Sequence, residues 1–420
     1  MRLVLYKTIK SKQGGSQSNA WDRDIVWHNG HSTQAKHVVA TEVNDRPLVT
    51  SGMHKLIPYE ISDVFATKAK DDGSVTEIDE ETGFMIVTYK DGKKDIFNTK
   101  PQMNKNSTGG FYTLQPLVPL FTVGKKFKKG DILLSNPDFF DGKTQGDISY
   151  TIGTLAKVSL TPTDGTYEDS SMVTTSLAKK MTTKINMKRS ITLGPKANLQ
   201  FLATEGQAIK TGDPLIIFEN EFDDSSVNDL LANIGDEFEL EIQDLTSKTL
   251  KSKYTGKVTK INIFFNHDLD DYSPSIQKIL KPYIQKNAKR AAKINSVKKD
   301  LKGELPINLD IGSIQRTDQT KIGGEEFDGL LIEMFVEYKD ELGVGDKISF
   351  NTALKTVVSD VFPKGEEPYS DFRPDEPIDA FLSPLSVVSR MTTDYFSLAL
   401  TNKVLIELKR SIADIMAGKK

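Results

Sequence analysis

Two lysines, Lys347 and Lys355, stand eight residues apart just after a glycine turn, and their side chains could bind phosphate. The turn contains Gly343 and Gly345 and ends an apolar run of strand length over residues 330–336. A lysine ammonium group is a compact point charge that suits a phosphate oxygen. The spacing predicts a phosphate-binding segment at the end of a buried strand. The alternative is that both lysines are ordinary solvated surface residues.

A loop that ends in two acidic residues follows a second expected strand. Apolar and polar residues alternate over 156–160, which predicts a strand with one buried face. Pro162 ends that strand, so residues 164–169 form a loop that ends in Glu168 and Asp169. From residue types alone, this pair is an acidic turn that caps the next element.

Four segments carry recognisable motifs. In chain order they read Asp45-Arg46-Pro47-Leu48-Val49-Thr50-Ser51-Gly52-Met53, Asp164-Gly165-Thr166-Tyr167-Glu168-Asp169-Ser170, Gly345-Asp346-Lys347 followed by Lys355, and Pro377-Ile378-Asp379-Ala380-Phe381-Leu382-Ser383-Pro384-Leu385-Ser386-Val387-Val388-Ser389-Arg390-Met391. At compatible spacings they resemble motifs of the catalytic β subunit of multisubunit RNA polymerases. The family's versions of the first, second and fourth motifs read Asp-Lys-Pro-Leu-Val-Gly-Thr-Gly-Met, Asn-Gly-Tyr-Asn-Phe-Glu-Asp-Ser and Asn-Pro-Leu-Gly-Val-Pro-Ser-Arg-Met. The chain departs from the family at residues 350–354, where cellular enzymes carry Gly-Arg-His-Gly-Asn, and at Val388, which replaces a proline.

The resemblance implies roles for five residues in nucleotidyl transfer. Lys347 and Lys355 would contact the RNA 3′ end and the substrate phosphates. Glu168 and Asp169 would help to place a second magnesium ion that arrives with the nucleotide, and Arg390 would bind the triphosphate. The main Mg²⁺ ligands would come from a partner chain of the β′ type.

Two other interpretations bear on these sites. Arg390 could instead pair with an acidic neighbour such as Asp379 and hold its loop. The loop at residues 136–142 superficially resembles the magnesium-binding loop of the β′ subunit, but its spacing differs and its position matches a β-subunit turn without a catalytic role. We therefore expect no metal site there.

His28, His31 and His37 lie close in sequence, but without a cysteine or an acidic residue at ligand spacing they indicate ordinary polar contacts.

The pattern of elements predicts a β-dominated α+β fold. Short strands broken by turns fill residues 42–193, with a clear hairpin over residues 83–97. By resemblance, the core is a double-psi β-barrel built from residues near 150–190 and 325–391. The expected divisions are a fork-proximal segment (1–41), a hybrid-binding region with the first barrel strands (42–194), an inserted flap or wall domain (195–322), and the second part of the barrel with a C-terminal helix (323–420).

Two amphipathic helices are expected. Residues 276–302 combine apolar residues at helical spacing with a strongly basic outer face. Four of these basic residues are weak candidates for nucleic-acid contact: Lys286, Lys289, Arg290 and Lys293. The alternative is a solvated basic face. Residues 392–420 form a second helix with broad apolar sides, and such a helix needs a partner surface in this chain or in another.

Composition limits the classes of function. With 420 residues, 37% hydrophobic and 27% charged, the chain can form two or three domains with real cores. The net charge of -3 gives no global nucleic-acid signature, so any such contact must come from local patches. The absence of cysteine excludes disulfides, thiolate metal sites and a cysteine nucleophile. No run approaches the roughly 18–20 apolar residues of a membrane span, so no membrane partner is expected.

The resemblance to β subunits implies that the chain is the C-terminal piece of a split RNA polymerase β subunit of the giant-bacteriophage type. Its expected partners are an N-terminal β polypeptide, β′-type polypeptides, a promoter-specificity subunit, template DNA, transcript and nucleoside triphosphates. Its expected location is the cytoplasm of the infected host cell, or else the virion. The alternatives are a polymerase-like scaffold and a β-rich virion component, both without catalysis.

Overall fold

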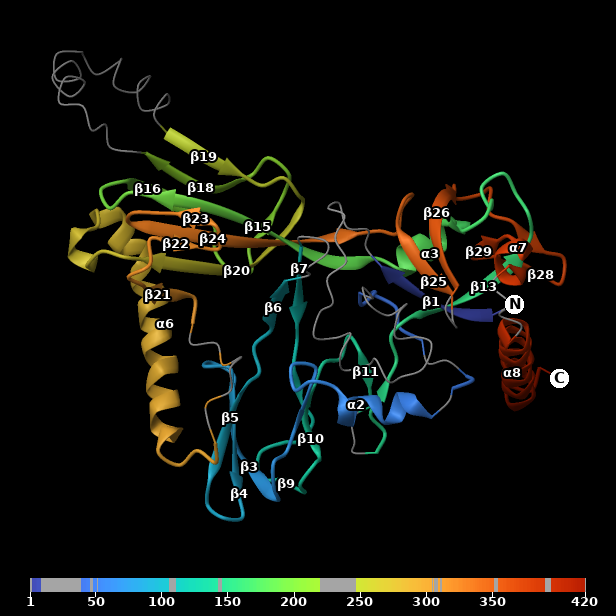
Figure 1. The fold of residues 1–420 in the computed structure, drawn as a ribbon, viewed down its shortest axis with the longest axis horizontal. Coiled ribbons are helices and arrows are strands. Elements are labelled where there is room, and N and C mark those ends of the chain that lie inside the picture. The colour runs from blue at the N-terminus through green and yellow to red at the C-terminus, as the bar shows by residue number, and fades with distance from the viewer. Residues whose placement is uncertain are drawn as a thin grey trace, which may run out of the picture.

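The computed structural model describes residues 2–8, 39–45, 48–50, 52–105, 111–142, 146–219, 247–303, 305, 309, 312–350, 354–389 and 394–419. Strands dominate this part of the chain, as the sequence predicted. The molecule is elongated, with a barrel at one end, a long sheet that leads away from it, and smaller sheets beneath (Figure 1). His28, His31 and His37 lie outside the described residues.

A closed six-stranded barrel forms one end of the molecule. Its strands, in spatial order, are β1 (Arg2–Thr8), β13 (Thr154–Leu160), β29 (Ala380–Leu382), β14 (Ser170–Thr174), β26 (Leu354–Phe362) and β25 (Lys347–Phe350). Two neighbouring pairs run parallel, β13 with β29 and β14 with β26, and the other pairs are antiparallel. Alternating side chains point inward, where Ala156, Val158, Ile348, Phe350 and Leu382 belong to one buried core.

The strand β1 was not assigned to the barrel from the sequence. Leu5 pairs with Thr154 on one side and with Phe350 on the other, so this strand closes the barrel. The remaining barrel strands come from the two regions that the sequence indicated.

A long antiparallel ribbon connects the barrel to the opposite end of the molecule (Figure 1). Thr183 pairs with Asp340, and the ladder continues without interruption to Leu193 opposite Leu330. The sheet around it contains β6 (Gln102–Lys105), β7 (Tyr112–Gln115), β15 (Thr183–Leu193), β17 (Ala208–Ile209), β20 (Gly256–Phe265), β21 (Ile314–Arg316) and β24 (Leu330–Asp340). Residues 330–336 of β24 are buried, which explains why this part of the strand is apolar except for Glu333.

Smaller sheets complete the fold. One four-stranded sheet contains β3 (Gly73–Asp79), β4 (Phe84–Tyr89), β5 (Lys94–Asn98) and β9 (Lys126–Phe127). Two three-stranded sheets contain β2 (Ala66–Lys68), β8 (Val118–Pro119) and β10 (Ile132–Ser135), and β16 (Asn198–Leu202), β18 (Pro214–Glu219) and β19 (Ser247–Lys251). Three two-stranded sheets pair β11 (Phe140–Asp141) with β12 (Ser149–Tyr150), β22 (Lys321–Ile322) with β23 (Glu325–Glu326), and β27 (Tyr369–Ser370) with β28 (Arg373–Pro377). The pairing of β4 with β5 confirms the predicted hairpin.

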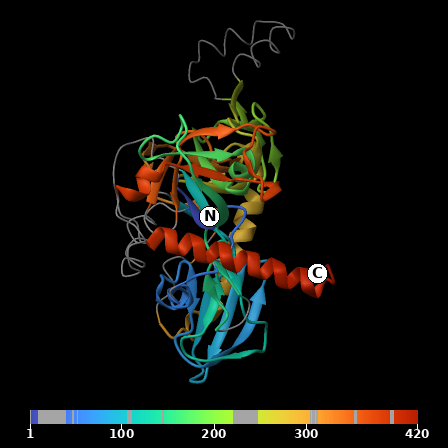
Figure 2. The same ribbon diagram turned by 90° about the vertical axis from the view of Figure 1, so that its right-hand side faces the viewer.

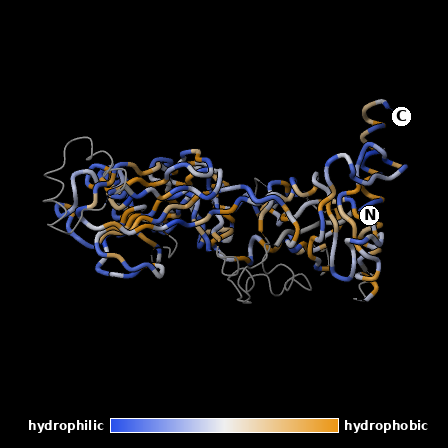
Figure 3. The backbone as a smooth tube through the Cα atoms, turned by 90° about the horizontal axis from the view of Figure 1, so that it is seen from above, coloured by the Kyte–Doolittle hydropathy of each residue, from blue (hydrophilic) through white to orange (hydrophobic). Residues whose placement is uncertain are grey.

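The helices are few. They are α2 (Ile57–Glu60), α3 (Thr175–Lys180), α6 (Pro274–Lys298), α7 (Pro384–Val388) and α8 (Asp394–Met416), with 3₁₀ turns at Met53–Lys55 and Leu269–Asp271. Both expected amphipathic helices are confirmed as α6 and α8. In Figure 2, α8 crosses one face of the molecule as a rod, and its C-terminal end projects beyond the body, as Figure 3 also shows. Within the described residues, no helix is both long and apolar enough to cross a membrane.

Ion pairs fasten α8 to the barrel region. Glu407 lies 2.5 Å from Arg373, and Arg410 lies 2.7 Å from Glu376. On the barrel side of α8, Tyr395 is fully buried.

Candidate functional site

The β25–β26 hairpin places both predicted phosphate-binding lysines on one face. Lys347 pairs with Val357, and Lys355 pairs with Ser349 two residues further along. Side chains alternate along each strand, and directly paired residues share a face. Lys347 and Lys355 therefore lie diagonally across the same outer face, while Ile348 points into the barrel core. Both lysines are half-buried.

The turn before Lys347 is fixed by its own hydrogen bonds. Gly345 has φ 91°, a conformation that a side chain would oppose. The Asp346 carboxylate accepts the backbone N–H of Gly343 at 3.0 Å, and the Asp346 carbonyl accepts the N–H of Val358 at 2.8 Å. The Gly-Asp pair of this motif thus closes the turn against β26, so that Lys347 begins its strand from a rigid support.

The acidic loop before β14 is held by hydroxyl groups. Buried Thr166 accepts the N–H of Thr163 at 2.7 Å, and Ser170 donates to the carbonyl of Gly165 at 2.9 Å. Ser359, on β26, also donates to the carbonyl of Gly165. These bonds fix a short loop whose acidic side chains, at 168 and 169, remain exposed.

Glu168 has an unusual backbone conformation. Its φ of 50° makes it the only non-glycine residue with positive φ in the described part of the chain. The left-handed conformation costs a residue with a Cβ about 1–2 kcal/mol. Its carbonyl accepts a hydrogen bond from the hydroxyl of Ser386, which is 2% exposed. A contact from α7 therefore supports the strained residue.

The structure brings the acidic loop next to the lysine hairpin. The carbonyl of Asp169 accepts the N–H of Val357 at 2.9 Å, and Val357 is the residue that pairs with Lys347. The next residue, Ser170, continues the parallel pairing with Val357. Asp169 and Lys347 thus lie on opposite sides of one residue of β26, which places the acidic loop and the lysine hairpin in the same part of the barrel, called the barrel rim below.

Arg390 lies outside the described residues, but the segment before it is placed. Ser383 accepts the N–H of Leu385 at 3.3 Å and caps α7, which ends at Val388. Asp379, the alternative partner of Arg390, is buried and already engaged. One of its carboxylate oxygens accepts the N–H of Lys157 at 2.7 Å, and the other lies 3.9 Å from Lys180. These contacts provide Asp379 with partners on β13 and α3.

The basic face of α6 meets an acidic sheet edge. Lys286 lies 3.1 Å from Glu205, and two further lysines of α6 pair with acidic residues of the β3–β4 region. These last two ion pairs are Lys289 with Glu81 and Lys293 with Glu77, each at 2.5 Å. Three of the four predicted nucleic-acid contacts therefore already take part in intramolecular ion pairs.

The fourth residue, Arg290, lies inside the same interface. It is 3% exposed, and its guanidinium stacks over the ring of Phe84 at 4.4 Å. It donates to the carbonyl of Thr82 and, at 3.5 Å, to the side-chain oxygen of Asn98. Arg290 thus joins α6 to the β4–β5 hairpin. Nucleic-acid contact by these four residues stays a prediction, and the structure gives them an intramolecular role.

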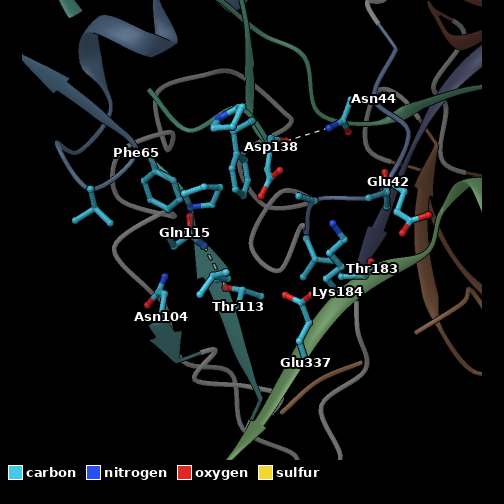
Figure 4. A pocket seen from close by; sticks show the side chains of 18 of the residues that line it. Glu42, Asn44, Phe65, Asn104, Thr113, Gln115, Asp138, Thr183, Lys184 and Glu337 are labelled. Carbon is cyan, nitrogen blue, oxygen red and sulfur yellow. Dashed lines mark hydrogen bonds between the residues drawn. The ribbon is translucent and has the colours of Figure 1, made fainter. Parts of the chain in front are cut away.

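A cavity of about 710 Å³ lies apart from the barrel rim. Glu42, Lys184 and Glu337 lie on one side of it, with Phe65 and Asp138 across from them (Figure 4). Asp138 is exposed as a whole residue, but partial burial of its carboxyl group raises the pKa above its ordinary value, while Lys184 nearby opposes this rise. None of the predicted phosphate or metal ligands is among the described residues that line the cavity.

Asp138 belongs to the loop that was excluded as a metal site. Asn136 is buried there, donates to Gln115 at 2.7 Å and accepts the N–H of Asp138 at 2.9 Å. The loop is thus a turn held by an asparagine. Among the described residues, no group of three or more histidine, aspartate and glutamate side chains could hold a metal ion.

The acidic pair at the rim does fit a metal that is only partly bound by this chain. Mg²⁺ usually keeps several waters and binds through one or two carboxylates together with substrate phosphates. Glu168 and Asp169 are exposed carboxylates at neighbouring positions, beside a hairpin whose strands β25 and β26 each carry one of the two lysines. Together they could supply one or two carboxylates to such an ion.

Sequence reasoning missed Ser386. The signal was present, because the family's motif has glycine at this position and glycine cannot donate a side-chain hydrogen bond. Only the structure shows the acceptor, which lies far away in sequence at Glu168.

Comparison with known proteins identifies relatives. The family described as RNA polymerase Rpb2, domain 6, matches residues 163–410. The DNA-directed RNA polymerase subunit beta of Caldicellulosiruptor saccharolyticus is 22% identical over 369 residues, which are 86% of this chain and 25% of that protein. The same subunit of Thermus aquaticus is 23% identical over 387 residues, 86% of this chain and 28% of that protein. The chain thus spans about a quarter of the length of these relatives.

Proposed function

Because this chain belongs to the RNA polymerase Rpb2 domain 6 family, we propose that it contributes the phosphate-binding rim of a DNA-dependent RNA polymerase active centre. The observation that carries the proposal is that Asp169 and Lys347 lie on opposite sides of Val357, with Lys355 on the same face of the hairpin as Lys347. Motifs that are far apart in sequence converge there. They are the motifs that the resemblance to β subunits had indicated.

The proposed reaction is nucleotidyl transfer. The RNA 3′-hydroxyl oxygen attacks the α-phosphorus of a nucleoside triphosphate, a new O–P bond forms, and the bond to the β-phosphate oxygen breaks to release pyrophosphate. Lys347 and Lys355 place positive charge beside the phosphates and the RNA 3′ end, and Arg390 binds the triphosphate. The role of this chain is electrostatic and positional.

Magnesium supplies charge neutralisation at the attacking and leaving oxygens when it is bound. In this proposal Glu168 and Asp169 help to hold the ion that arrives with the nucleotide, and the main ligands come from a β′-type partner. The exposure of both carboxylates at the rim supports this division.

We also propose that the barrel is of the double-psi type. Six strands in a closed barrel, with the parallel pairs β13–β29 and β14–β26, support this topology. In this scheme residues 195–322 are the inserted flap domain, and α6 is its basic helix.

The finer identity is proposed from the sequence resemblance. The chain acts as the C-terminal part of a split β subunit of the giant-bacteriophage type, with an N-terminal β polypeptide, β′-type polypeptides and a promoter-specificity subunit as partners. It works on template DNA, transcript and nucleoside triphosphates in the infected cell's cytoplasm, or is carried in the virion. Mass spectrometry of the enzyme purified through a tag on this chain tests the subunit composition.

The test of the site is Asp169→Asn in the assembled enzyme. We expect the magnesium concentration for half-maximal synthesis to rise about tenfold, because the substitution weakens one carboxylate contact to the metal or its waters. Template affinity and assembly stay at the level of the unaltered enzyme. Asp164→Asn, an exposed residue of the same loop, is the matched control and leaves the magnesium titration unchanged.

Two results would contradict the proposal. An unchanged magnesium titration for Asp169→Asn would reduce the acidic pair to a cap and favour a scaffold role for this chain. Robust RNA synthesis by the isolated chain would remove the division of metal ligands between chains.

A further inference from the structure

Ser386 connects two segments that the proposed function treats separately. It lies on α7, which ends at Val388, directly before Ser389 and the segment that contains Arg390. Its hydroxyl group donates a hydrogen bond to the carbonyl of Glu168 in the acidic loop. Because Ser386 is 2% exposed, water cannot readily replace this donor.

The bond is placed where the loop most needs support. Glu168 is the left-handed residue of the described chain, with φ 50°, and its conformation directs the backbone into Asp169. On the other side, the Asp169 carbonyl is fixed by the N–H of Val357 at 2.9 Å. Two hydrogen bonds therefore hold the backbone that carries the Asp169 carboxylate. Ser386 on α7 donates to the carbonyl of Glu168, and Val357 on β26 donates to the carbonyl of Asp169.

We propose that Ser386 is a positioning residue that sets the orientation of Asp169 toward the nucleotide-borne metal and links it to the segment before Arg390. This inference rests on the proposed function of the barrel rim. Ser386 touches neither substrate nor metal and acts through the backbone of Glu168. A β-type sequence with glycine at this position lacks the side-chain donor, so the link is a specific property of this chain.

Ser386→Ala in the assembled enzyme tests the role. We expect kcat/KM for nucleotide at limiting Mg²⁺ to fall about two- to tenfold, as the loss of one hydrogen bond permits. The loss shrinks at saturating Mg²⁺, because a poorly oriented carboxylate weakens metal capture first. Ser386→Thr keeps a hydroxyl donor and restores part of the efficiency.

Ser383→Ala is the control for a merely structural effect. It removes the cap of α7, so it lowers the melting temperature of the complex while the magnesium dependence stays unchanged. If Ser383→Ala reproduced the magnesium shift of Ser386→Ala, loosening of α7 would explain both, and the positioning role would be overturned.

A double-mutant cycle with Asp169→Asn separates this inference from the proposed function. If Ser386 acts through Asp169, Ser386→Ala adds no further shift to the magnesium titration of Asp169→Asn. Two outcomes would overturn this inference and leave the proposed function standing. One is that the magnesium shifts of the two substitutions are independent and add. The other is that the Ser386→Ala enzyme matches the unaltered one while the Asp169→Asn enzyme is impaired. An Asp169→Asn enzyme with normal magnesium dependence would overturn the proposed function and the inference with it.

Discussion

The two long helices, α6 and α8, have similar amphipathic sequences but contrasting surroundings. On α6, Lys289 and Lys293 of the basic face pair with acidic residues of the same chain, and Arg290 is buried. On α8 an apolar stripe is turned outward, and Leu400 and Leu408 are 64% and 53% exposed. Several basic groups of α6 thus have partners within this chain, while hydrophobic surface of α8 is left uncovered by the described residues.

The contrast shows what helical periodicity can and cannot predict. Periodicity identifies the faces of a helix, because side chains three and four residues apart lie together. It does not identify the surface that covers each face. For α6 that surface comes from residues 77–98, about 200 positions earlier in the chain, so its ion pairs could not be inferred from local pattern.

The largest expected effect is at Arg290. Arg290→Ala should lower the free energy of unfolding by about 2–4 kcal/mol, because it opens a cavity over Phe84 and leaves the buried acceptors Thr82 and Asn98 without their donor. Denaturant titration followed by fluorescence measures the change. A loss below about 1 kcal/mol would mean that α6 is not anchored through this residue.

The next effect concerns the attachment of α8. Hydrogen bonds from Lys403 and Arg373 lower the pKa of Glu407 to about 2, and a bond from Lys157 lowers the pKa of Glu376 to about 2. A carboxyl group whose pKa is lowered by folding stabilises the protein above its ordinary pKa of 4.5. This contribution is lost as the pH falls from about 4.5 to about 2.

Glu407→Gln should therefore cost about 1 kcal/mol at neutral pH and less at pH 3. Hydrogen exchange over α8, measured at both values, reports the effect locally. If exchange in the unaltered protein were the same at neutral pH and at pH 3, after correction for the intrinsic rate, these ion pairs would not hold the helix.

A smaller effect on stability is expected when the exposed apolar stripe of α8 is changed. Replacing Leu400 and Leu408 by glutamine should alter the unfolding free energy of the chain by no more than about 0.5 kcal/mol each, because both side chains are already largely in water. Self-association of the isolated chain, followed by light scattering, should fall. A strong loss of stability would show that the stripe packs within this chain.

The smallest effect is expected at Lys289. Its partner Glu81 is 71% exposed and its own side chain is 63% exposed, so solvent screens the pair. Lys289→Gln should leave the unfolding transition unchanged within measurement, at both low and high salt. It is the matched control for Arg290→Ala, since the two residues are neighbours on α6. If Lys289→Gln and Arg290→Ala lowered the free energy of unfolding equally, Arg290 would not anchor α6 more strongly than the exposed ion pair of Lys289 does.

Much of the fold was predictable because it depends on local pattern. The hairpin at residues 83–97, the strand ending at Leu160 and the apolar strand β24 all follow from alternation or continuous hydrophobicity. The motifs also indicated that residues near 168 and 347 share a site, and the structure places them on either side of Val357.

The remaining features depend on contacts between distant residues. Leu5 has no local feature that specifies Thr154 and Phe350 as its neighbours. The left-handed conformation of Glu168 is equally hidden, because glutamate does not favour it and only the support from Ser386 and the loop hydroxyls maintains it. The sequence could therefore indicate that the segments around Asp169 and Lys347 belong together, but not the hydrogen bonds that hold their backbones.

The closing position of β1 has a consequence for the order of folding. Residues 2–8 leave the ribosome before the strands on both sides of them, at residues 154–157 and 347–350, have been made. Until then the strand has two unpaired edges, and its last pairing must wait for a segment about 340 positions further along the chain. Barrel closure thus follows the synthesis of residues 347–350, and the growing polypeptide needs protection from edge-to-edge aggregation during that interval.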